Sequence, residues 1–254
     1  MKHVPEALCA FFSEHPKIAL AFSGGCDSAY LMYAAKACGA DVRAYYVRSQ
    51  FQPAFELEDA LRLSEALNCI MKIIDMDVLA DEKVRSNPSD RCYHCKQRIF
   101  SAILSSTEED GYSCIIDGTN ASDDASDRPG MRAIQEMHVL SPLRCCGISK
   151  AEVRCLSKEA GLFTWNKPAY ACLATRIPSC MAIDAEILGS VERAEENLSR
   201  MGFSDFRVRV TGNGARLEIT EEQLPLLIEK RKDIISVLEA DFPEICLNLR
   251  VRTN

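Results

Sequence analysis

The chain has 254 residues, of which 47% are hydrophobic and 26% charged, and this composition is typical of a globular protein with one large domain or two modest ones. A formal net charge of -7 argues against nucleic acid as a partner held by a broadly basic surface, although it leaves room for a local basic groove. No segment has the roughly 20 apolar residues of a membrane helix, and the N-terminus makes a poor signal peptide, so we expect a cytoplasmic protein that does not enter a membrane.

The first half of the chain alternates short apolar runs with amphipathic stretches. This alternation of strands and helices predicts an α/β fold with a parallel, doubly wound sheet. The expected strands are 18–22, 42–47, 69–75 and 113–120, and the expected helices are 28–39, 55–68 and about 93–106.

The middle of the chain is more polar. Residues 121–130 read as a loop, and Ser149 with Glu152 forms the sequence pattern of a capping box at the start of a helix. Residues 166–180, "NKPAYACLATRIPSC", contain two prolines and show no clean period, so we expect a long functional loop or a linker.

The last part of the chain reads as a smaller α+β domain. Its expected order is a helix at 184–203, strands at 206–210 and 215–219, a helical stretch at 221–240 and a strand at 245–251. Asn213-Gly214 is a strong hairpin signal between the first two strands. We therefore place a first domain at 1–180 and a second at 181–254.

The segment "SGGCDS" (23–28) lies between the first expected strand and the first expected helix. Gly24 and Gly25 allow a tight turn and close approach of an anion, Ser23 and Ser28 offer hydroxyls, and the helix start favours negative charge. Asp27 fits beside a phosphate if it binds Mg²⁺. The alternative is an ordinary glycine turn capped by serine.

The pattern SGG-x-DS resembles that of the PP-loop ATP pyrophosphatase superfamily. The resemblance implies that the loop binds the pyrophosphate of ATP and that AMP is transferred to an acceptor oxygen, with a catalytic part for Asp27. Asp117 and Asn120 of "DGTN" end the fourth expected strand, where ligands of parallel sheets gather, so we expect both to face the nucleotide.

Further segments resemble the LarE family of ATP-dependent sulfur transferases over residues of about 15–250. These segments are "NPSDRCYHCK", "IIDGTNASDD", "DRPGMRA", "SPL" and "NKPAYACLATRIP", in this order. The resemblance implies an enzyme that adenylylates a carboxylate of a pyridinium mononucleotide, a small-molecule substrate, and replaces oxygen by sulfur in making the cofactor of nickel-pincer enzymes. Members of this family also form homo-oligomers.

Cys92 and Cys95 of "RCYHCK" supply two thiols at a metal-binding spacing, but two ligands do not complete a zinc site, and no second pair stands at that spacing. The resemblance adds Cys172 and implies that the three hold a [4Fe-4S] cluster with one open iron, which would carry hydrosulfide. In another branch of the family a sacrificial cysteine gives up its sulfur, but that position is Ala171 here. The alternative for Cys92 and Cys95 is burial as ordinary core residues.

Arginines and one glutamate complete the expected site. Arg207 and Arg209 share one face of an alternating strand and should face solvent or a ligand. The resemblance implies that they and Arg176 bind the substrate phosphate, and that Glu195 binds a divalent ion. The alternative for the arginines is an ordinary solvent-exposed face of a sheet. The alternative for Glu195 is a solvent-exposed face of a helix.

Two departures from the family pattern leave rival functions open. "RIPSC" replaces the usual "RIPYG" and adds Cys180 as a spare thiol or alternative ligand, and the end "LNLRVRTN" lacks the usual D-L-G-aromatic sequence. The rivals are a PP-loop tRNA thiolation enzyme, against which the acidic balance argues, an ATP-dependent amidotransferase, and a nucleotide-binding module without catalysis.

Overall fold

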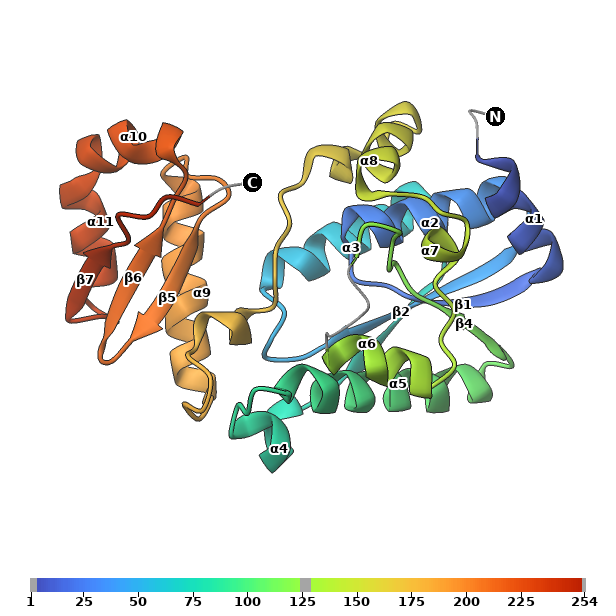
Figure 1. Ribbon diagram of the computed structural model, residues 1–254, viewed down its shortest axis with the longest axis horizontal. Helices are drawn as coiled ribbons and strands as arrows, with labels where there is room; N and C mark the ends of the chain where they lie inside the picture. Colours follow the sequence, from blue (N-terminus) through green and yellow to red (C-terminus); the bar gives the residue numbers. More distant parts are fainter. Residues whose placement is uncertain (1–3, 124–128, 253–254) are drawn as a thin grey trace. The chain divides into compact units, whose positions relative to one another are not determined.

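The computed structural model describes residues 4–123 and 129–252, so part of the expected polar loop at 121–130 lies outside the described residues. The chain forms two compact units (Figure 1). The first consists of Met1–Val78 and Asp90–Lys167, and the second of Leu79–Ser89 and Pro168–Asn254. The division in the chain thus falls after Lys167, and a short segment between the third strand and the fifth helix belongs to the second unit.

The first unit contains a four-stranded parallel sheet, as the sequence predicts. Its strands stand in the order β3-β2-β1-β4. They are β1 (Lys17–Ala21), β2 (Asp41–Arg48), β3 (Met71–Asp75) and β4 (Cys114–Ile116). The third and fourth strands are shorter than expected, and 117–120 form a loop beyond the sheet.

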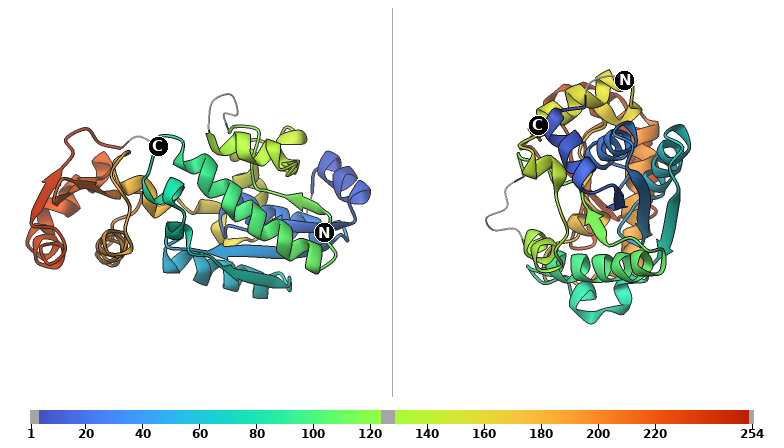
Figure 2. Two further views of the ribbon diagram at one scale, coloured as in Figure 1. Left: turned by 90° about the horizontal axis from the view of Figure 1, so that it is seen from below. Right: turned by 90° about the vertical axis from the view of Figure 1, so that its right-hand side faces the viewer.

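Helices cover both faces of this sheet because successive strand residues point to opposite sides. Leu20 packs into the core on one face and Ala19 into the core on the other. One face carries α1 (Glu6–Glu14), α2 (Cys26–Ala37), α3 (Ala54–Ala66), α7 (Pro142–Cys145) and α8 (Lys150–Glu159). The other carries α5 (Arg91–Glu109) and α6 (Pro129–Glu136), and Figure 2 shows α5 as one long helix laid along the sheet.

The strand order creates a switch point between β1 and β4. These strands are neighbours, with Leu20 opposite Ile116, but the chain leaves β1 for β2 on one side and reaches β4 from the far edge. Loops diverge above such a point and leave a crevice at the carboxyl ends of the strands. Residues 23–28, called the phosphate loop below, follow β1, and Asp117 follows β4 directly. Both therefore lie at this crevice.

The second unit is an α+β arrangement around a three-stranded sheet. The sheet pairs β5 (Arg207–Thr211) antiparallel with β6 (Gly214–Glu218), which pairs in parallel with β7 (Glu244–Leu247). Figure 1 shows α9 (Ala185–Arg200) packed behind the strands. The remaining helices are α4 (Glu82–Arg85), α10 (Leu224–Glu229) and α11 (Arg231–Leu238), so the expected helix at 221–240 is broken into short pieces.

The hairpin turn lies one residue earlier than the Asn213-Gly214 signal predicts. Thr211 pairs with Gly214, which leaves Gly212 and Asn213 as the two turn residues, and Gly212 has a φ of 58°. A glycine in the left-handed region at the first turn position is typical of a II′ turn. Gly214 instead begins β6, where a Cβ atom would lie 2.5 Å from the Glu244 carbonyl oxygen.

Two further local observations complete the fold. Ser149 and Glu152 form the predicted capping box at the start of α8. Across the two described stretches of chain, we find no helix that combines the length and apolar character needed to cross a membrane.

Candidate functional site

The phosphate loop joins β1 to α2 through a tightly bonded turn. Gly24 has a φ of 70°, in the region that favours glycine, and a Cβ atom there would lie 3.0 Å from the Glu56 carbonyl oxygen of α3. The hydroxyls of Ser23 and Ser28 are 3.1 Å apart, and Ser28 also donates to the Gly25 carbonyl oxygen. Gly25, the N-cap residue of α2, provides no side-chain cap, and its own N–H donates to Ser23 Oγ at 3.4 Å. The start of a helix of this kind is a suitable place for an anion.

Asp27 stands in the first turn of α2 with one carboxylate oxygen unsatisfied. Its Oδ2 atom is ion-paired with Lys150 Nζ, whereas its Oδ1 atom is buried and has no hydrogen-bond partner among the residues that the structure describes. Lys150 is itself held at the start of α8, where its backbone N–H donates to Ser122 Oγ. A buried carboxylate oxygen without a donor is a suitable ligand for a hard cation such as Mg²⁺.

Asp117 is fixed on the other side of the crevice by a small hydrogen-bond network. Its Oδ1 atom accepts from Ser141 Oγ at 2.7 Å, and its Oδ2 atom accepts from Thr119 Oγ1 at 2.6 Å. Gly118 lets this loop approach α2, because a Cβ there would lie 3.1 Å from the Ser28 nitrogen. The "SPL" segment therefore orients the carboxylate that follows β4.

A cavity of about 590 Å³ opens within the first unit beside these loops. Ser23, Asp27, Ser28 and Asp117 are among the residues that line it, together with apolar side chains from β2 and α5. Asn120 is buried and its Oδ1 atom accepts from the Ser122 N–H, so part of its side chain serves the turn. Its expected role at the nucleotide stays a prediction.

Lys96 enters the same cavity from α5. Burial lowers the pKa of its ammonium group, while the charges of Asp117, Cys92, Asp123 and Cys95 act in the opposite direction. Its side chain passes close to Gly130 of α6, where a Cβ atom would lie 3.0 Å from the Lys96 Cδ atom. The motif "RCYHCK" and Gly130 of α6 thus meet at this lysine.

Cys92 and Cys95 lie in the first two turns of α5, three residues apart and therefore on one side of the helix. Cys92 is exposed and lines the cavity, whereas Cys95 is buried, and Arg91 donates to Cys92 Sγ at 3.6 Å. Their expected role as cluster ligands stays a prediction. The third expected ligand, Cys172, belongs to the second unit, and within the described residues no three His, Cys, Asp or Glu side chains gather as metal ligands.

In the second unit, Glu195 and Arg176 form a buried pair. The Arg176 Nε and Nη2 atoms donate to the two carboxylate oxygens at 2.8 and 2.9 Å. Glu195 also accepts from the Tyr170 hydroxyl and from the Val208 N–H. The substrate role expected of Arg176 and the metal role expected of Glu195 stay predictions.

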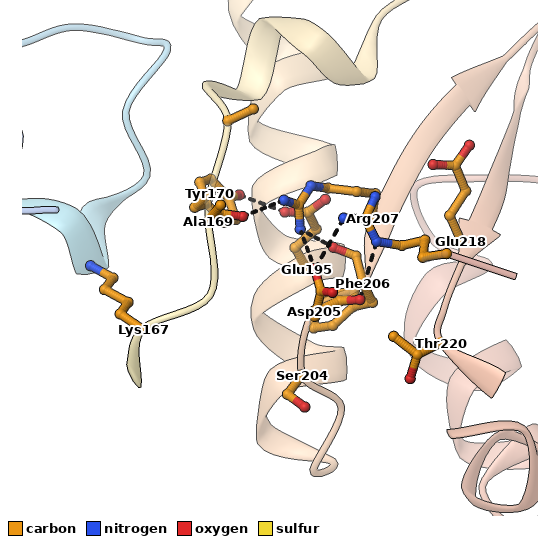
Figure 3. Close-up of polar contacts among 12 residues, drawn as sticks. Lys167, Ala169, Tyr170, Glu195, Ser204, Asp205, Phe206, Arg207, Glu218 and Thr220 are labelled. Carbon is orange, nitrogen blue, oxygen red and sulfur yellow. Dashed lines mark hydrogen bonds and ion pairs between the residues drawn. The ribbon is translucent and has the colours of Figure 1, made fainter. Parts of the chain in front are cut away.

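Arg207 and Arg209 share a face of β5 as predicted, but Arg207 does not face solvent: it is only 7% exposed, because it packs under the 168–180 loop. Arg207 donates to the Ala169 carbonyl oxygen at 2.5 Å and Arg209 to that of Thr175 at 2.6 Å. Figure 3 shows Arg207 and Glu195 directed toward the segment that carries Ala169 and Tyr170. Cys172 is half-buried and lies in this hydrogen-bonded loop, just before the 3₁₀ turn Leu173–Arg176.

Sequence reasoning missed several residues of the first-unit site. They are Lys96, Lys150, Thr119, Ser141 and Gly130. All of them except Lys150 lie inside quoted motifs and were detectable there. The pairing of Lys150 with Asp27 had no local signal, since 123 residues separate the two.

A parallel sheet of order β3-β2-β1-β4, with the glycine-rich loop 23–28 at its switch point, defines an α/β fold of the PP-loop class. A scan against models of protein families gives no match. Among curated proteins, an uncharacterized protein of Synechocystis sp. is 35% identical over 225 residues, which cover 88% of this chain and 84% of the relative.

Two further relatives have named activities. A pyridinium-3,5-bisthiocarboxylic acid mononucleotide synthase of Lactiplantibacillus plantarum is 30% identical over 219 residues, covering 85% of this chain and 79% of that protein. A tRNA-specific 2-thiouridylase of Clostridium botulinum is 26% identical over 182 residues, which cover 59% of this chain and 52% of that protein. The chain therefore belongs to the LarE family, that of the pyridinium-3,5-bisthiocarboxylic acid mononucleotide synthases.

Proposed function

We propose that the protein is an ATP-dependent sulfur transferase that acts on a carboxylate of a pyridinium mononucleotide. The observation that carries the ATP part is the buried, unpartnered Oδ1 atom of Asp27, in the first turn of an uncapped helix and beside a glycine-rich loop. Phosphates bind at free helix N-termini, and a carboxylate there is accommodated through a divalent cation. Family membership supports the choice of acceptor.

The proposed reaction has two balanced steps. A carboxylate oxygen attacks the α-phosphorus of ATP, the bond to the β-phosphate oxygen breaks, and pyrophosphate leaves. A sulfur nucleophile then attacks the carboxyl carbon, and AMP departs with the original oxygen. Adenylylation is required because oxide is a poor leaving group.

Residues of the first unit divide the work of the first step. The phosphate loop would bind the pyrophosphate, and Asp27 would hold Mg²⁺, which neutralises charge on the departing group. Lys150 would add a second positive charge once phosphate competes for it with Asp27. Lys96, inside the cavity, would face the anionic acceptor.

The sulfur source is proposed to be a [4Fe-4S] cluster held by Cys92, Cys95 and Cys172. Such a cluster, when bound, supplies an open iron that binds hydrosulfide. Arg91 donates to Cys92 Sγ, so a cationic side chain lies beside the pair. The arginines that fasten the 168–180 loop would position Cys172.

The test of the ATP step is pyrophosphate release with the pyridinium dicarboxylate mononucleotide as acceptor. We expect Asp27→Asn to lower the rate at least about 100-fold, because the cation loses its ligand. Asp75→Asn is the matched control, since Asp75 is an exposed carboxylate that pairs with Arg48 on β2, and it should leave the rate unchanged. Equal rates in the wild type and Asp27→Asn would refute the proposed role.

The test of the sulfur source is anaerobic purification followed by iron and sulfide analysis. Wild type should carry both elements, and Cys95→Ala should lose them. Cys155→Ala, at an exposed cysteine of α8, should retain them. A wild type without iron that loses the mass of hydrogen sulfide on turnover would instead indicate a sacrificial cysteine.

The second candidate function is tRNA thiolation, which the more distant thiouridylase relative favours. The net charge of -7 provides little attraction for a polyanion. A gel shift with tRNA over a series of salt concentrations separates the two functions. Salt-sensitive binding, together with a tRNA-dependent release of pyrophosphate, would favour the thiolase.

A further inference from the structure

Two thiols remote from the phosphate site lie in direct contact. Cys9 is on α1 and Cys38 is the residue that ends α2, and their Sγ atoms are 2.7 Å apart. That separation exceeds a disulfide bond of about 2.05 Å by less than about 1 Å. Both side chains are half-buried, so small solutes can reach the pair.

The surroundings of this pair differ from those of other thiols in the first unit. Cys26 is buried against the Ser157 hydroxyl at 3.5 Å, and Cys69 is buried and donates to the Val42 carbonyl oxygen at 3.4 Å. Those thiols are buried and contact no second thiol among the described residues. Cys9, which also contacts the Val4 carbonyl oxygen at 4.0 Å, and Cys38 combine mutual contact with partial exposure, which is what disulfide exchange requires.

We infer that Cys9 and Cys38 form a reversible disulfide site, which small disulfides such as oxidised glutathione close. The Cys9 thiolate attacks one sulfur of glutathione disulfide and releases one glutathione thiolate. Cys38 gives its proton to solvent, attacks the Cys9 sulfur and releases the second glutathione. Two protein thiols are oxidised and one glutathione disulfide is reduced to two thiols.

Burial indicates the order of attack. Burial, together with the neighbouring Cys9 thiol, raises the pKa of Cys38 to about 12. A thiol of this kind is a slow first nucleophile in neutral solution. Cys9 on α1 is therefore the entry point, and Cys38 reacts second, with the adjacent Cys9 sulfur.

The disulfide would close a ring around the phosphate loop. The segment from Cys9 to Cys38 contains β1, residues 23–28 and all of α2. A cross-link over a loop of this length restricts the unfolded chain, and we expect it to raise the Tm by about 5–10 °C. The inference does not depend on the proposed sulfur transfer, because it concerns the end of α2 opposite to the phosphate loop.

The test uses the full chain under native conditions in buffers of graded glutathione ratio, followed by acid quenching, alkylation and peptide mapping. We expect a linked Cys9–Cys38 peptide, two fewer alkylated thiols and full reversal by reduced glutathione. In Cys38→Ser, the adduct with glutathione should accumulate on Cys9, because the resolving thiol is absent. Cys155→Ser is the control and should form the linked peptide like the wild type.

Thermal unfolding provides a second readout that does not rely on peptide recovery. Oxidised wild type and oxidised Cys155→Ser should both gain the Tm increase, whereas Cys9→Ser should gain none. The inference fails if glutathione stays attached to Cys9 in the wild type, or if both thiols remain alkylatable while the exposed Cys155 reacts. A linked peptide without any rise in Tm would refute the closed ring as a stabilising device.

Discussion

Lys150 and Lys96 both lie at the crevice of the first unit, but they have different neighbours. Lys150 is ion-paired with Asp27, whereas Lys96 lies along Gly130 among cavity-lining groups. Burial of the charged Lys96 ammonium group destabilises the fold, but it keeps a positive charge in the cavity where a ligand can use it. Stability and activity are therefore expected to respond in opposite directions when Lys96 is replaced.

We predict that Lys96→Met raises the free energy of unfolding at neutral pH and lowers the rate of pyrophosphate release at least about tenfold. The native pKa of Lys96 is lowered from its ordinary value of about 10.4. Between the native and unfolded values the unfolded wild type binds more protons, so wild-type stability rises with pH there.

The excess stability of Lys96→Met should accordingly be largest below that window and should shrink as the pH approaches about 10.4. Denaturant titrations of both proteins over this pH range check the prediction. Lys150→Met is the comparison, because that lysine pairs directly with a carboxylate. A variant that is less stable than wild type at neutral pH would contradict the account of Lys96.

At the scale of elements, the second sheet depends on a close approach between β6 and β7. Gly214 pairs with Glu244, and a Cβ atom at Gly214 would lie 2.5 Å from the Glu244 carbonyl oxygen and 2.7 Å from its Cβ. These atoms belong to a paired strand and cannot move without breaking the pairing. Glycine at this position is thus required by packing rather than by the turn.

We predict that Gly214→Ala lowers the free energy of unfolding by about 1–3 kcal/mol, through overpacking of two paired strands. Gly189→Ala on α9 is the matched control in the same unit. The Cβ there would meet only the flexible end of Arg193, and alanine favours the helix by up to about 1 kcal/mol. Equal chemical denaturation curves for the two variants would rule out the packing explanation.

The elements with strong internal patterns were predictable from sequence, and those fixed by distant contacts were not. The alternation of strands and helices predicts the four-stranded parallel sheet, and Ser149 with Glu152 predicts the cap of α8. The turn at Gly212 was misplaced because Asn213-Gly214 is the stronger local signal, while contact with β7 determines where β6 begins.

The same distinction applies to the site. The glycine-rich loop and Asp117 are adjacent to strand ends and could be predicted, whereas the burial of Arg207 could not. Strand periodicity places Arg207 on a polar face, but the 168–180 loop covers that face through the Ala169 carbonyl oxygen. The contact between this loop and Arg207 is long-range, so it is visible only in the folded chain.

At the scale of the whole molecule, the second unit is built from two separate stretches of the chain. Residues 79–89 contact 168–254 through backbone and side-chain hydrogen bonds. Asn87 Nδ2 donates to the Pro178 carbonyl oxygen at 2.9 Å and its own carbonyl accepts from Cys180 N–H at 2.8 Å, while the Arg85 carbonyl accepts from Ile183 N–H at 2.8 Å. The sequence predicts a boundary near 180 from the order of the expected helices and strands. That order does not reveal that an earlier segment returns to the loop carrying Cys172.

We predict that Asn87→Ala speeds amide exchange in residues 168–180 and lowers the free energy of unfolding by about 1–3 kcal/mol, because the side-chain hydrogen bond is lost. Asn87→Gly is the control for the backbone, since Asn87 has a φ of 52°, which glycine adopts freely. Amide exchange in residues 168–180 should become faster in both variants. The free energy of unfolding should fall further in Asn87→Ala than in Asn87→Gly. Unchanged exchange in both would show that Asn87 does not hold the loop.

The central claim is that ATP is used to exchange oxygen for sulfur on a pyridinium mononucleotide carboxylate. The most direct measurement is the mass of that acceptor after anaerobic incubation with the protein, ATP, Mg²⁺ and sulfide, alongside quantified AMP and pyrophosphate. The account predicts an acceptor heavier by the difference between sulfur and oxygen, with one AMP and one pyrophosphate formed for each exchange. An acceptor of unchanged mass, while ATP is consumed and the protein retains its sulfur source, would contradict it.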